Sequence, residues 1–433
     1  MSEQPTPFND LISETRDGEW GEGAETPGHT LCEVIRGTDF ADLHDASLQL
    51  PRRWIPVHLV ERKALVPSDI LIETAGGTAK QSTGRTALLT EAFFERHNQM
   101  PVLCSSFARH LRVDPSKVSA DYLYYVLQGL YRGGYMAVFN LQHTGISRFQ
   151  FTSFRKKTLL ALAPIAAQPK IAAILSAYND LIANNQRRIA LLESMAEEIY
   201  REWFVRMRFP GWRRANYKQT LPEDWAVVPM ESLFKTVSGG TPSRSSSDNF
   251  GGEVAWVKTG ELKSMFVNST EETLSARGLA SSAAKVLPRH TVVMAMYCAM
   301  PDVAILGVDA ATNQACCSLL PKRPAIGYAW TYFFARKTLE QLVNFAHGAA
   351  QQNLSQEIIR KFRVLYPSDK LVACFCEQVT PLLEEVEVVS LATTCLGQVR
   401  DALLPRLISG KLKVDQLDIR VPPRMRTESE AVA

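Results

Sequence analysis

The sequence contains two copies of one pattern, and this internal duplication is the feature that most limits the folds open to the chain. Three segments recur in the same order, with offsets of 222, 221 and 203 positions: 34–39 with 256–261, 65–71 with 286–292, and 160–164 with 362–367. The offset drops by 18 between the second pair and the third, so the copies differ in length in their middles. A repeat of this length predicts two similar domains in tandem.

A long run of apolar residues, spaced by alternate steps of four and three, follows each copy. This heptad spacing extends from about residue 168 to 208 and again from about 375 to 407. Each helix could pack on its own domain, but two seams of similar length favour pairing of the helices as an antiparallel coiled coil. The positions expected in helix pairing are Ile171, Leu175, Ile182, Asn185, Ile189, Leu192, Leu382, Val386, Val389, Leu396 and Leu403.

Polar residues and prolines interrupt these seams. Asn185 is expected either to fix the register of the pairing or to mark a local bend. Pro381 predicts a break near the start of the second helix, and Pro405 predicts a kink or an end one turn early, because proline lacks the N–H and clashes with the preceding turn. Ser409-Gly410 is typical of a helix stop.

The segments before the helices predict mixed domains. Apolar runs at 69–72, 291–294 and 304–308 indicate strands, and 122–131 and 328–345 indicate helices. The predicted fold class is α+β, with two similar mixed α/β domains in tandem, separated by two long helices and related by a pseudo-two-fold axis. The expected segments are a flexible tail at 1–9, a first domain at 10–165, a first long helix at 166–209, a linker at 210–225, a second domain at 226–367, a second long helix at 368–414 and a tail at 415–433.

The composition excludes several classes of protein. Lys and Arg total 48 against 45 Asp and Glu, and a net charge of +3 excludes a uniformly basic protein but allows a local basic face. No apolar run reaches the ~18 residues of a membrane span, and the first residues lack the pattern of a secretory signal, so the expected location is cytoplasmic. The eight cysteines form no Cys-x-x-Cys pair, and we expect reduced thiols and no metal site.

The sequence lacks the common catalytic motifs, and this favours a binding protein over an enzyme. The loop at 77–86 has the wrong glycine spacing for a phosphate-binding loop and carries Arg85 where that loop needs lysine. Nuclease-like Glu-x-Lys triplets at 61–63 and 261–263 lack a preceding Pro-Asp at a useful spacing. A nucleophile elbow, a zinc-protease helix and a methyltransferase Asn-Pro-Pro-aromatic motif are missing. We therefore expect no catalytic residue and no cofactor bound by this chain.

Polar and basic residues gather in loops of both copies, a pattern that favours nucleic acid as the partner. Arg and Lys suit phosphates and guanine edges, while Asn and Gln can pair with adenine. A single loop of this kind is more often solvated surface, but loops of similar character in both copies favour DNA. The expected DNA-binding residues are Arg52, Arg53, Lys80, Gln81, Arg85, Arg148, Thr241, Ser243, Arg244, Lys258, Asn313 and Gln351.

The second copy opens with Val-Ser-Gly-Gly-Thr-Pro-Ser-Arg at 237–244, followed by Phe-Gly-Gly-Glu-Val-Ala-Trp-Val at 250–257. This pattern resembles the opening of a target recognition domain in the specificity (S) subunits of type I restriction-modification enzymes. Residues 17–21 and 34–40 of the first copy are similar to the other common opening of that family, although they depart from the Gly-Gly-Thr-Pro form.

Later segments extend the likeness over about residues 10–415. Gln-Gln-Asn-Leu at 351–354 and the Leu-rich Ser-Gly segment at 403–412 are similar to the family, whereas the first long helix ends in Trp203-Phe204 instead. The resemblance implies a non-catalytic subunit in which each recognition domain reads one half of a bipartite, asymmetric DNA target. The helices would set the spacer and dock two modification subunits.

The resemblance also implies the partners. They are double-stranded DNA, two modification (methyltransferase) subunits and the restriction (translocase and nuclease) subunits, and no membrane is among them. S-adenosylmethionine, ATP and Mg²⁺ are expected in those partner subunits. The alternatives are a coiled-coil scaffold with no role on DNA and a self-sufficient nuclease or methyltransferase. Because DNA contacts release counterions, sequence-specific binding that weakens steeply with salt separates the leading interpretation from the scaffold.

Overall fold

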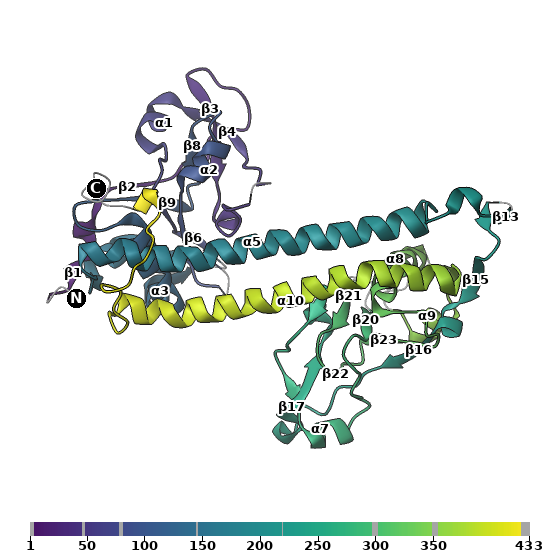
Figure 1. The fold of residues 1–433 in the computed structure, drawn as a ribbon. Helices are drawn as coiled ribbons and strands as arrows, with labels where there is room; N and C mark the ends of the chain where they lie inside the picture. Colours follow the sequence, from purple (N-terminus) through teal and green to yellow (C-terminus); the bar gives the residue numbers. More distant parts are fainter. Residues whose placement is uncertain are drawn as a thin grey trace. The chain divides into compact units, whose positions relative to one another are not determined.

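The computed structural model describes residues 4–45, 48–77, 81–143, 146–218, 220–296, 302–348 and 354–425 (Figure 1). The chain divides into two compact units, of which the first comprises residues 1–183 and 395–433 and the second comprises residues 184–394. Each unit combines one mixed α/β domain with parts of both long helices. The unit boundaries therefore fall inside the helices and not at the ends of the predicted domains.

The first unit is a mixed domain whose strands are β1 (Thr6–Pro7), β2 (Ile12–Asp17), β3 (His29–Ile35), β4 (Arg52–Pro56), β5 (Ile70–Glu73), β6 (Ala75–Gly77), β7 (Thr86–Leu88), β8 (Val102–Cys104), β9 (Ala108–Val113), β10 (Asn140–His143), β11 (Ile146–Phe149) and β12 (Leu159–Leu160). An antiparallel sheet has the order β2-β9-β5-β7. A three-stranded sheet has the order β4-β3-β8, with β3 and β8 parallel. The remaining strands form β10-β11-β6 and β1-β12. Its shorter helices are α1 (Val57–Lys63), α2 (Glu91–Arg96), α3 (Ala120–Arg132) and α4 (Phe151–Lys157).

The second unit has strands β13 (Tyr217–Lys218), β14 (Leu221–Pro222), β15 (Ala226–Pro229), β16 (Phe234–Ser238), β17 (Phe250–Val257), β18 (Phe266–Val267), β19 (Thr273–Leu274), β20 (Val292–Ala295), β21 (Val303–Leu306), β22 (Ala310–Thr312), β23 (Cys316–Pro321) and β24 (Arg363–Tyr366). A five-stranded sheet has the order β16-β23-β20-β21-β18. A three-stranded sheet has the order β19-β17-β22, with β17 and β22 parallel. The pairs β13-β14 and β15-β24 complete the strands. Its shorter helices are α6 (Met230–Leu233), α7 (Ala276–Ala280), α8 (Tyr328–Gly348) and α9 (Gln356–Lys361).

The duplication read from the sequence is present in the folded chain. Thr6 pairs with Leu160 across β1 and β12, and Val228 pairs with Val364 across β15 and β24. Thr6 and Val228 are 222 positions apart, and Leu160 and Val364 are 204 positions apart. The offset between the copies therefore drops by 18 in the structure as well, and both offsets are one larger than the 221 and 203 found in the sequence. The fold class is confirmed as two mixed domains. Their larger sheets correspond as β2-β9-β5-β7 and β16-β23-β20-β21, with β18 added in the second unit.

A close main-chain crossing explains the glycine that opens each copy. A Cβ atom on Gly18 would lie 2.1 Å from the carbonyl oxygen of Cys104, the last residue of β8. A Cβ atom on Gly239 would lie 1.8 Å from the carbonyl oxygen of Thr312, the last residue of β22. In both units the chain leaving the larger sheet passes directly over the parallel pair of the smaller sheet. Only glycine fits such an approach of two backbones.

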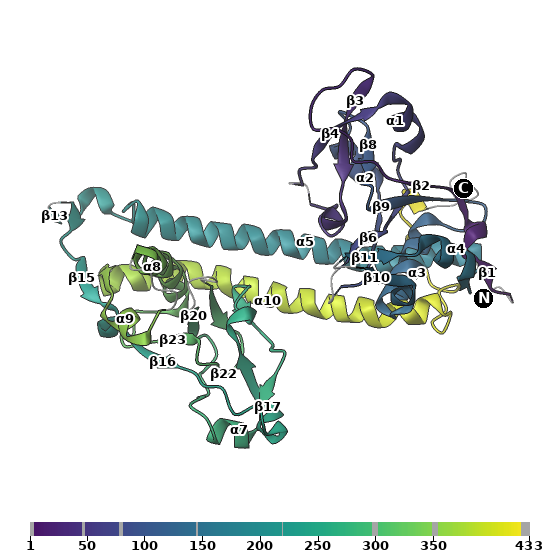
Figure 2. The ribbon, with the colours of Figure 1, turned by 180° about the vertical axis from the view of Figure 1, so that it is seen from behind.

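Helices α5 (Gln168–Tyr200) and α10 (Asp369–Ile408) supply the long helices that the heptad pattern predicts. In the first unit the early part of α5 and the late part of α10 share one core, through Ile171, Leu175, Leu404 and Leu407. In the second unit the late part of α5 and the early part of α10 share another, with Ala196, Tyr200, Phe375 and Val379 among its buried residues. Within each unit the two helices therefore run antiparallel, as Figure 2 shows from behind.

Every residue of the predicted seam is buried or half-buried. Ile171, Leu175, Val386 and Val389 are buried, while Ile182, Asn185, Ile189, Leu192, Leu382, Leu396 and Leu403 are half-buried. Leu383, which the heptad count omitted, is fully buried in place of its neighbour Leu382. No helix among the described residues is long and apolar enough to cross a lipid bilayer.

The break predicted at Pro381 and the early end predicted at Pro405 were both wrong. Helix α10 continues through Pro381 and Pro405 without a break. Pro381 and Glu377, whose carbonyl loses its helical partner, both lie on the exposed side, where water can replace the lost hydrogen bond. The buried side chains of Phe375, Val379 and Leu383 hold this part of the helix in the core. The predicted stop is confirmed, since α10 ends at Ile408 and Gly410 has a φ of 69°.

The chain ends are more ordered than the predicted tails. At the start, β1 pairs with β12 and Phe8 is fully buried, so structure within the predicted tail begins at Thr6. At the end, Val414 and Met425 are buried in the core of the first unit. Lys170 Nζ donates to the carbonyl oxygens of Asp415 (3.2 Å) and Leu417 (3.1 Å). The segment 415–425 is therefore part of the first unit and not a free tail.

Candidate nucleic-acid interface

In the second unit, the predicted contacts gather at one edge of the three-stranded sheet. Because β17 and β22 are parallel, the residues that follow them, Lys258 and Asn313, lie at the same edge, and the Asn313 N–H donates to the carbonyl of Val257 (3.0 Å). The loop after β16 reaches the same edge, where the Gly240 N–H donates to the carbonyl of Thr312 (2.9 Å). The structure thus brings together Thr241, Ser243, Arg244, Lys258 and Asn313, as equivalent positions at strand ends can do.

The Gly-Gly-Thr-Pro segment is held on this edge by side chains. The indole N–H of the buried Trp256 donates to the carbonyl of Gly240 (3.1 Å). The hydroxyl of Thr241 donates to the amide oxygen of Gln314, and the hydroxyls of Ser243 and Ser245 lie 2.7 Å apart. These contacts fix the loop while leaving Thr241 and Ser243 exposed.

Two cations on this edge are ion-paired with carboxylates. The guanidinium of Arg244 donates to both oxygens of Glu272, at 2.5 and 2.9 Å. The ammonium of Lys258 donates to Glu271 (2.9 Å) and Glu272 (3.0 Å). The hydrogen bonds from Arg244 and Lys258 lower the pKa of Glu272 to about 2, so this carboxylate is ionised at neutral pH. The Arg244 guanidinium also lies 4.7 Å from the ring centre of Phe250.

The first unit presents its predicted arginines on β4, which pairs with β3. The guanidinium of Arg53 lies 4.4 Å from the ring centre of Trp20, a cation–π contact. Arg52 lies opposite Glu33, with a loose ion pair of 3.9 Å, and its side chain is 57% exposed. The carboxyl edge of the parallel pair is built as in the second unit, since the Ser105 N–H donates to the carbonyl of Ile35 (2.8 Å).

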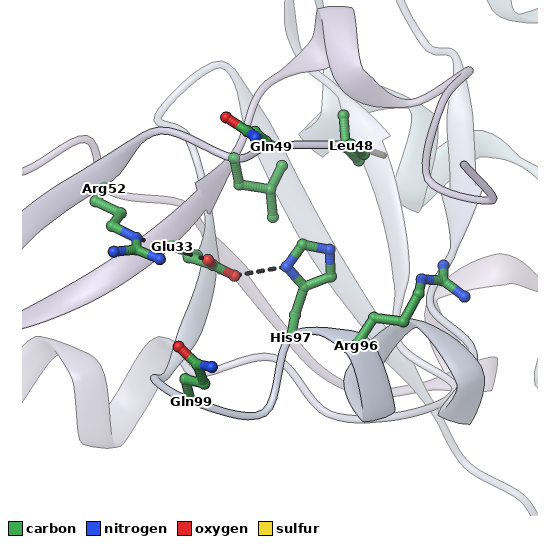
Figure 3. A pocket seen from close by; sticks show the side chains of 8 residues that line it. Glu33, Leu48, Gln49, Arg52, Arg96, His97 and Gln99 are labelled. Carbon is green, nitrogen blue, oxygen red and sulfur yellow. Dashed lines mark hydrogen bonds and ion pairs between the residues drawn. The ribbon is translucent and has the colours of Figure 1, made fainter. Parts of the chain in front are cut away.

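A polar pocket of about 660 Å³ adjoins Arg52 in the first unit (Figure 3). At its centre Nδ1 of His97 lies 2.6 Å from a carboxylate oxygen of Glu33, and the ring stacks on Phe93. The amides of Gln49 and Gln99 line it too. No motif in the sequence predicts this pocket, because its residues come from separate segments that only the fold brings together.

Three of the remaining predicted contacts come from other segments of the first unit. Arg85 pairs with Glu73 at 2.6 and 2.9 Å and donates to the carbonyl of Gly37 (3.0 Å). The hydrogen bond to Glu73 raises the pKa of Arg85, and the Glu73 side chain is only 3% exposed, so the pair is an internal one. Arg148 is exposed on β11, in a different sheet, and Gln81 is exposed. Lys80 and Gln351 lie outside the described residues.

Arg36 is a further basic residue at the edge of the first unit, which the predicted set lacks. It follows β3 as Lys258 follows β17, and the two positions are matched in the repeat at 34–39 and 256–261. Backbone and side chain of Arg36 both donate to Asp39, at 2.8 to 3.0 Å. The equivalent backbone bond runs from Lys258 to Glu261 (2.7 Å). The repeat itself was therefore a signal that could have found Arg36.

The thiols and the acidic groups offer no metal chemistry in the part of the chain that the structure describes. Cys32, Cys104, Cys316 and Cys317 are buried free thiols, whereas Cys374 and Cys395 are exposed. Burial raises the pKa of Cys32 to about 11 and that of the other three buried thiols to about 12. No group of three or more His, Cys, Asp or Glu side chains that could hold a metal is found among these residues.

Comparison with known proteins finds one family among the matches. Residues 222–371 match the family described as the type I restriction modification DNA specificity domain. The HindI specificity subunit of Haemophilus influenzae is 24% identical over 195 residues, which is 44% of this chain and 42% of that protein. The MjaIX specificity subunit of Methanocaldococcus jannaschii is 22% identical over 315 residues, or 69% and 71%. Residues 222–371 therefore match a type I specificity domain, and the chain as a whole is similar to type I specificity subunits.

A solved specificity subunit shares the architecture. The S subunit of a type I restriction-modification system from M. genitalium covers 94% of this chain and 97% of its own length, with a TM-score of 0.60 and 14% identity. The match to the HindI subunit spans less than half of that protein. The resemblance read from the sequence is confirmed, and the second mixed domain coincides with the matched specificity domain.

Proposed function

We propose that this specificity subunit recognises DNA without catalysing a reaction, and that each of its two mixed domains reads one half of a bipartite, asymmetric target. One observation carries the proposal. Both units build the same loop-bearing edge at the ends of a parallel strand pair, and a basic residue, Arg36 or Lys258, follows the first strand of each pair. Twin edges of one design suit two half-sites, and their different side chains suit different sequences.

The long helices complete the proposal. We assign to α5 and α10 the setting of the spacer between the half-sites and the docking of two modification subunits. The 40 residues of α10 give a helix of ~60 Å, a length comparable to one or two turns of B-DNA. The modification subunits would carry S-adenosylmethionine and methylate adenine. Restriction subunits would use ATP and Mg²⁺ to translocate and cleave DNA.

The test is DNA binding by the full chain together with modification subunits. The labelled target duplex and a duplex of the same composition with scrambled half-sites are titrated by fluorescence anisotropy between 50 and 200 mM salt. The proposal expects tight binding of the target, weaker binding of the scrambled duplex, and a steep loss of both with salt. Binding that does not distinguish the duplexes, or that salt leaves unchanged, favours the protein scaffold instead.

A further inference from the structure

The carboxylate of Glu272 has the contacts of a bound phosphate. It accepts two parallel hydrogen bonds from the Arg244 guanidinium, at 2.5 and 2.9 Å, and a third from the Lys258 ammonium, at 3.0 Å. A guanidinium fork recognises carboxylate and phosphate with the same bidentate geometry, and a lysine adds a point charge for either. We propose that Arg244 and Lys258 form a clamp for one phosphodiester of DNA, which Glu272 occupies in the free protein.

The clamp is fixed before DNA arrives. The Arg244 guanidinium lies over two rings, 4.7 Å from the centre of Phe250 and 5.4 Å from that of Trp256. The carbonyl of Glu272 accepts hydrogen bonds from the hydroxyl of Thr270 (2.7 Å) and from the N–H of Trp256 (3.3 Å). The backbone that carries the carboxylate is therefore tied to β17, while its side chain can turn away into solvent.

In the first unit, Arg36 occupies the position of Lys258 and has a buried carboxylate partner, Asp39. Asp39 accepts hydrogen bonds from both the backbone and the side chain of Arg36, and its side chain is 5% exposed. In the second unit these tasks are divided. Glu261 takes the backbone N–H of Lys258, and the ammonium turns to Glu271 and Glu272 instead. Glu272 can therefore leave the lysine without undoing the turn that follows β17.

The charges on the clamp explain what Glu272 does to affinity. Arg244 and Lys258 face Glu271 and Glu272, so the four side chains sum to zero net charge in the free protein. A phosphate has to displace a carboxylate that is ionised at neutral pH, and that exchange weakens binding to any DNA sequence. Because a phosphate carries no sequence information, the weakening is equal for target and non-target DNA.

The test is the Glu272→Gln variant of the full chain with modification subunits, and it rests on the proposed function. An exposed ion pair contributes at most about 1 kcal/mol, so binding should tighten about two- to fivefold on both the target and the scrambled duplex. The slope of log affinity against log salt should steepen by about one. The control is Glu357→Gln, which removes the same charge from the exposed pair of Glu357 and Lys361 on α9, and it should change neither quantity.

A second variant tests whether the gain depends on Arg244, while the Glu357→Gln control accounts for the general loss of one negative charge. Adding Arg244→Ala to Glu272→Gln should remove the whole gain. Unchanged or weaker binding by Glu272→Gln, or a gain on one duplex alone, overturns the clamp while leaving DNA recognition intact. If the wild-type chain binds neither duplex in a salt-dependent way, the proposed function fails and the clamp fails with it.

Discussion

Replacing Gly239 with alanine should destabilise the second unit and leave the first intact. The added methyl group would lie 1.8 Å from the carbonyl oxygen of Thr312 and 2.3 Å from its carbonyl carbon. Since both are main-chain atoms, no side chain can rotate away, and β16 or β22 has to shift. Overpacking of this kind costs about 1–3 kcal/mol, and two contacts with backbone place G239A at the upper end of that range.

Hydrogen exchange measures this cost locally. The amide of Gly240, bonded to Thr312, and the amide of Asn313, bonded to Val257, report the opening of this edge. A loss of about 3 kcal/mol speeds their exchange about 100-fold, because each 1.4 kcal/mol is a factor of ten. The amide of Ser105 in the first unit should exchange at the wild-type rate. Gly260 is the control, since a Cβ atom there meets nothing within 4 Å. Wild-type exchange at Gly240 and Asn313 in G239A would refute the crossing as the reason for this glycine.

Three further predictions test the helices and the internal ion pairs. Inserting four residues, one helical turn, into both α5 and α10 should lengthen the unread spacer of the target, and an unchanged spacer contradicts the ruler role. Arg85→Ala should cost about 3–5 kcal/mol of stability, because it leaves the buried carboxylate of Glu73 unpaired. The DNA affinity of the folded protein should not change. Weaker DNA binding with unchanged stability would instead show that Arg85 contacts DNA. The pKa of Glu272 falls from 4.5 to about 2 on folding, so its ion pairs stabilise the second unit above pH 4.5 and stop doing so as the pH falls toward 2. Arg244→Gln should therefore reduce the loss of stability of that unit between pH 4.5 and 2, as measured by urea denaturation at each pH. An unchanged pH profile would show that the Arg244–Glu272 ion pair does not cause this loss.

The duplicated architecture could be predicted because the internal repeat and the heptad spacing are both visible in the sequence. The repeat at 34–39 and 256–261 marks the ends of β3 and β17, which are equivalent strands of the two units, and the heptad spacing marks α5 and α10. The prolines led to a wrong prediction of where α10 is interrupted, because the effect of a proline depends on the side of the helix on which it lies. Pro381 lies on the exposed side, and the buried neighbours Val379 and Leu383 outweigh one missing hydrogen bond.

The site was harder to predict from the sequence than the fold, because a basic residue in a loop does not show which carboxylate it pairs with. Arg85 and Arg244 look alike in the sequence, yet Arg85 is enclosed with Glu73, while Arg244 lies exposed on two aromatic rings. The carboxylates that pair with them lie 12 and 28 positions away, with no local motif to connect them. The pocket around Glu33 and His97 likewise depends on a contact between residues 64 positions apart. Such pairings are set by the sheets and become visible only in the fold.

Sequencing of adenine methylation in a host with and without the gene is the most direct measurement of two-domain recognition. If each domain reads one half of a split target, the gene should add one motif, made of two short defined sequences separated by a spacer of fixed length and free composition. A single contiguous motif, or the same methylation pattern in both hosts, would contradict the account.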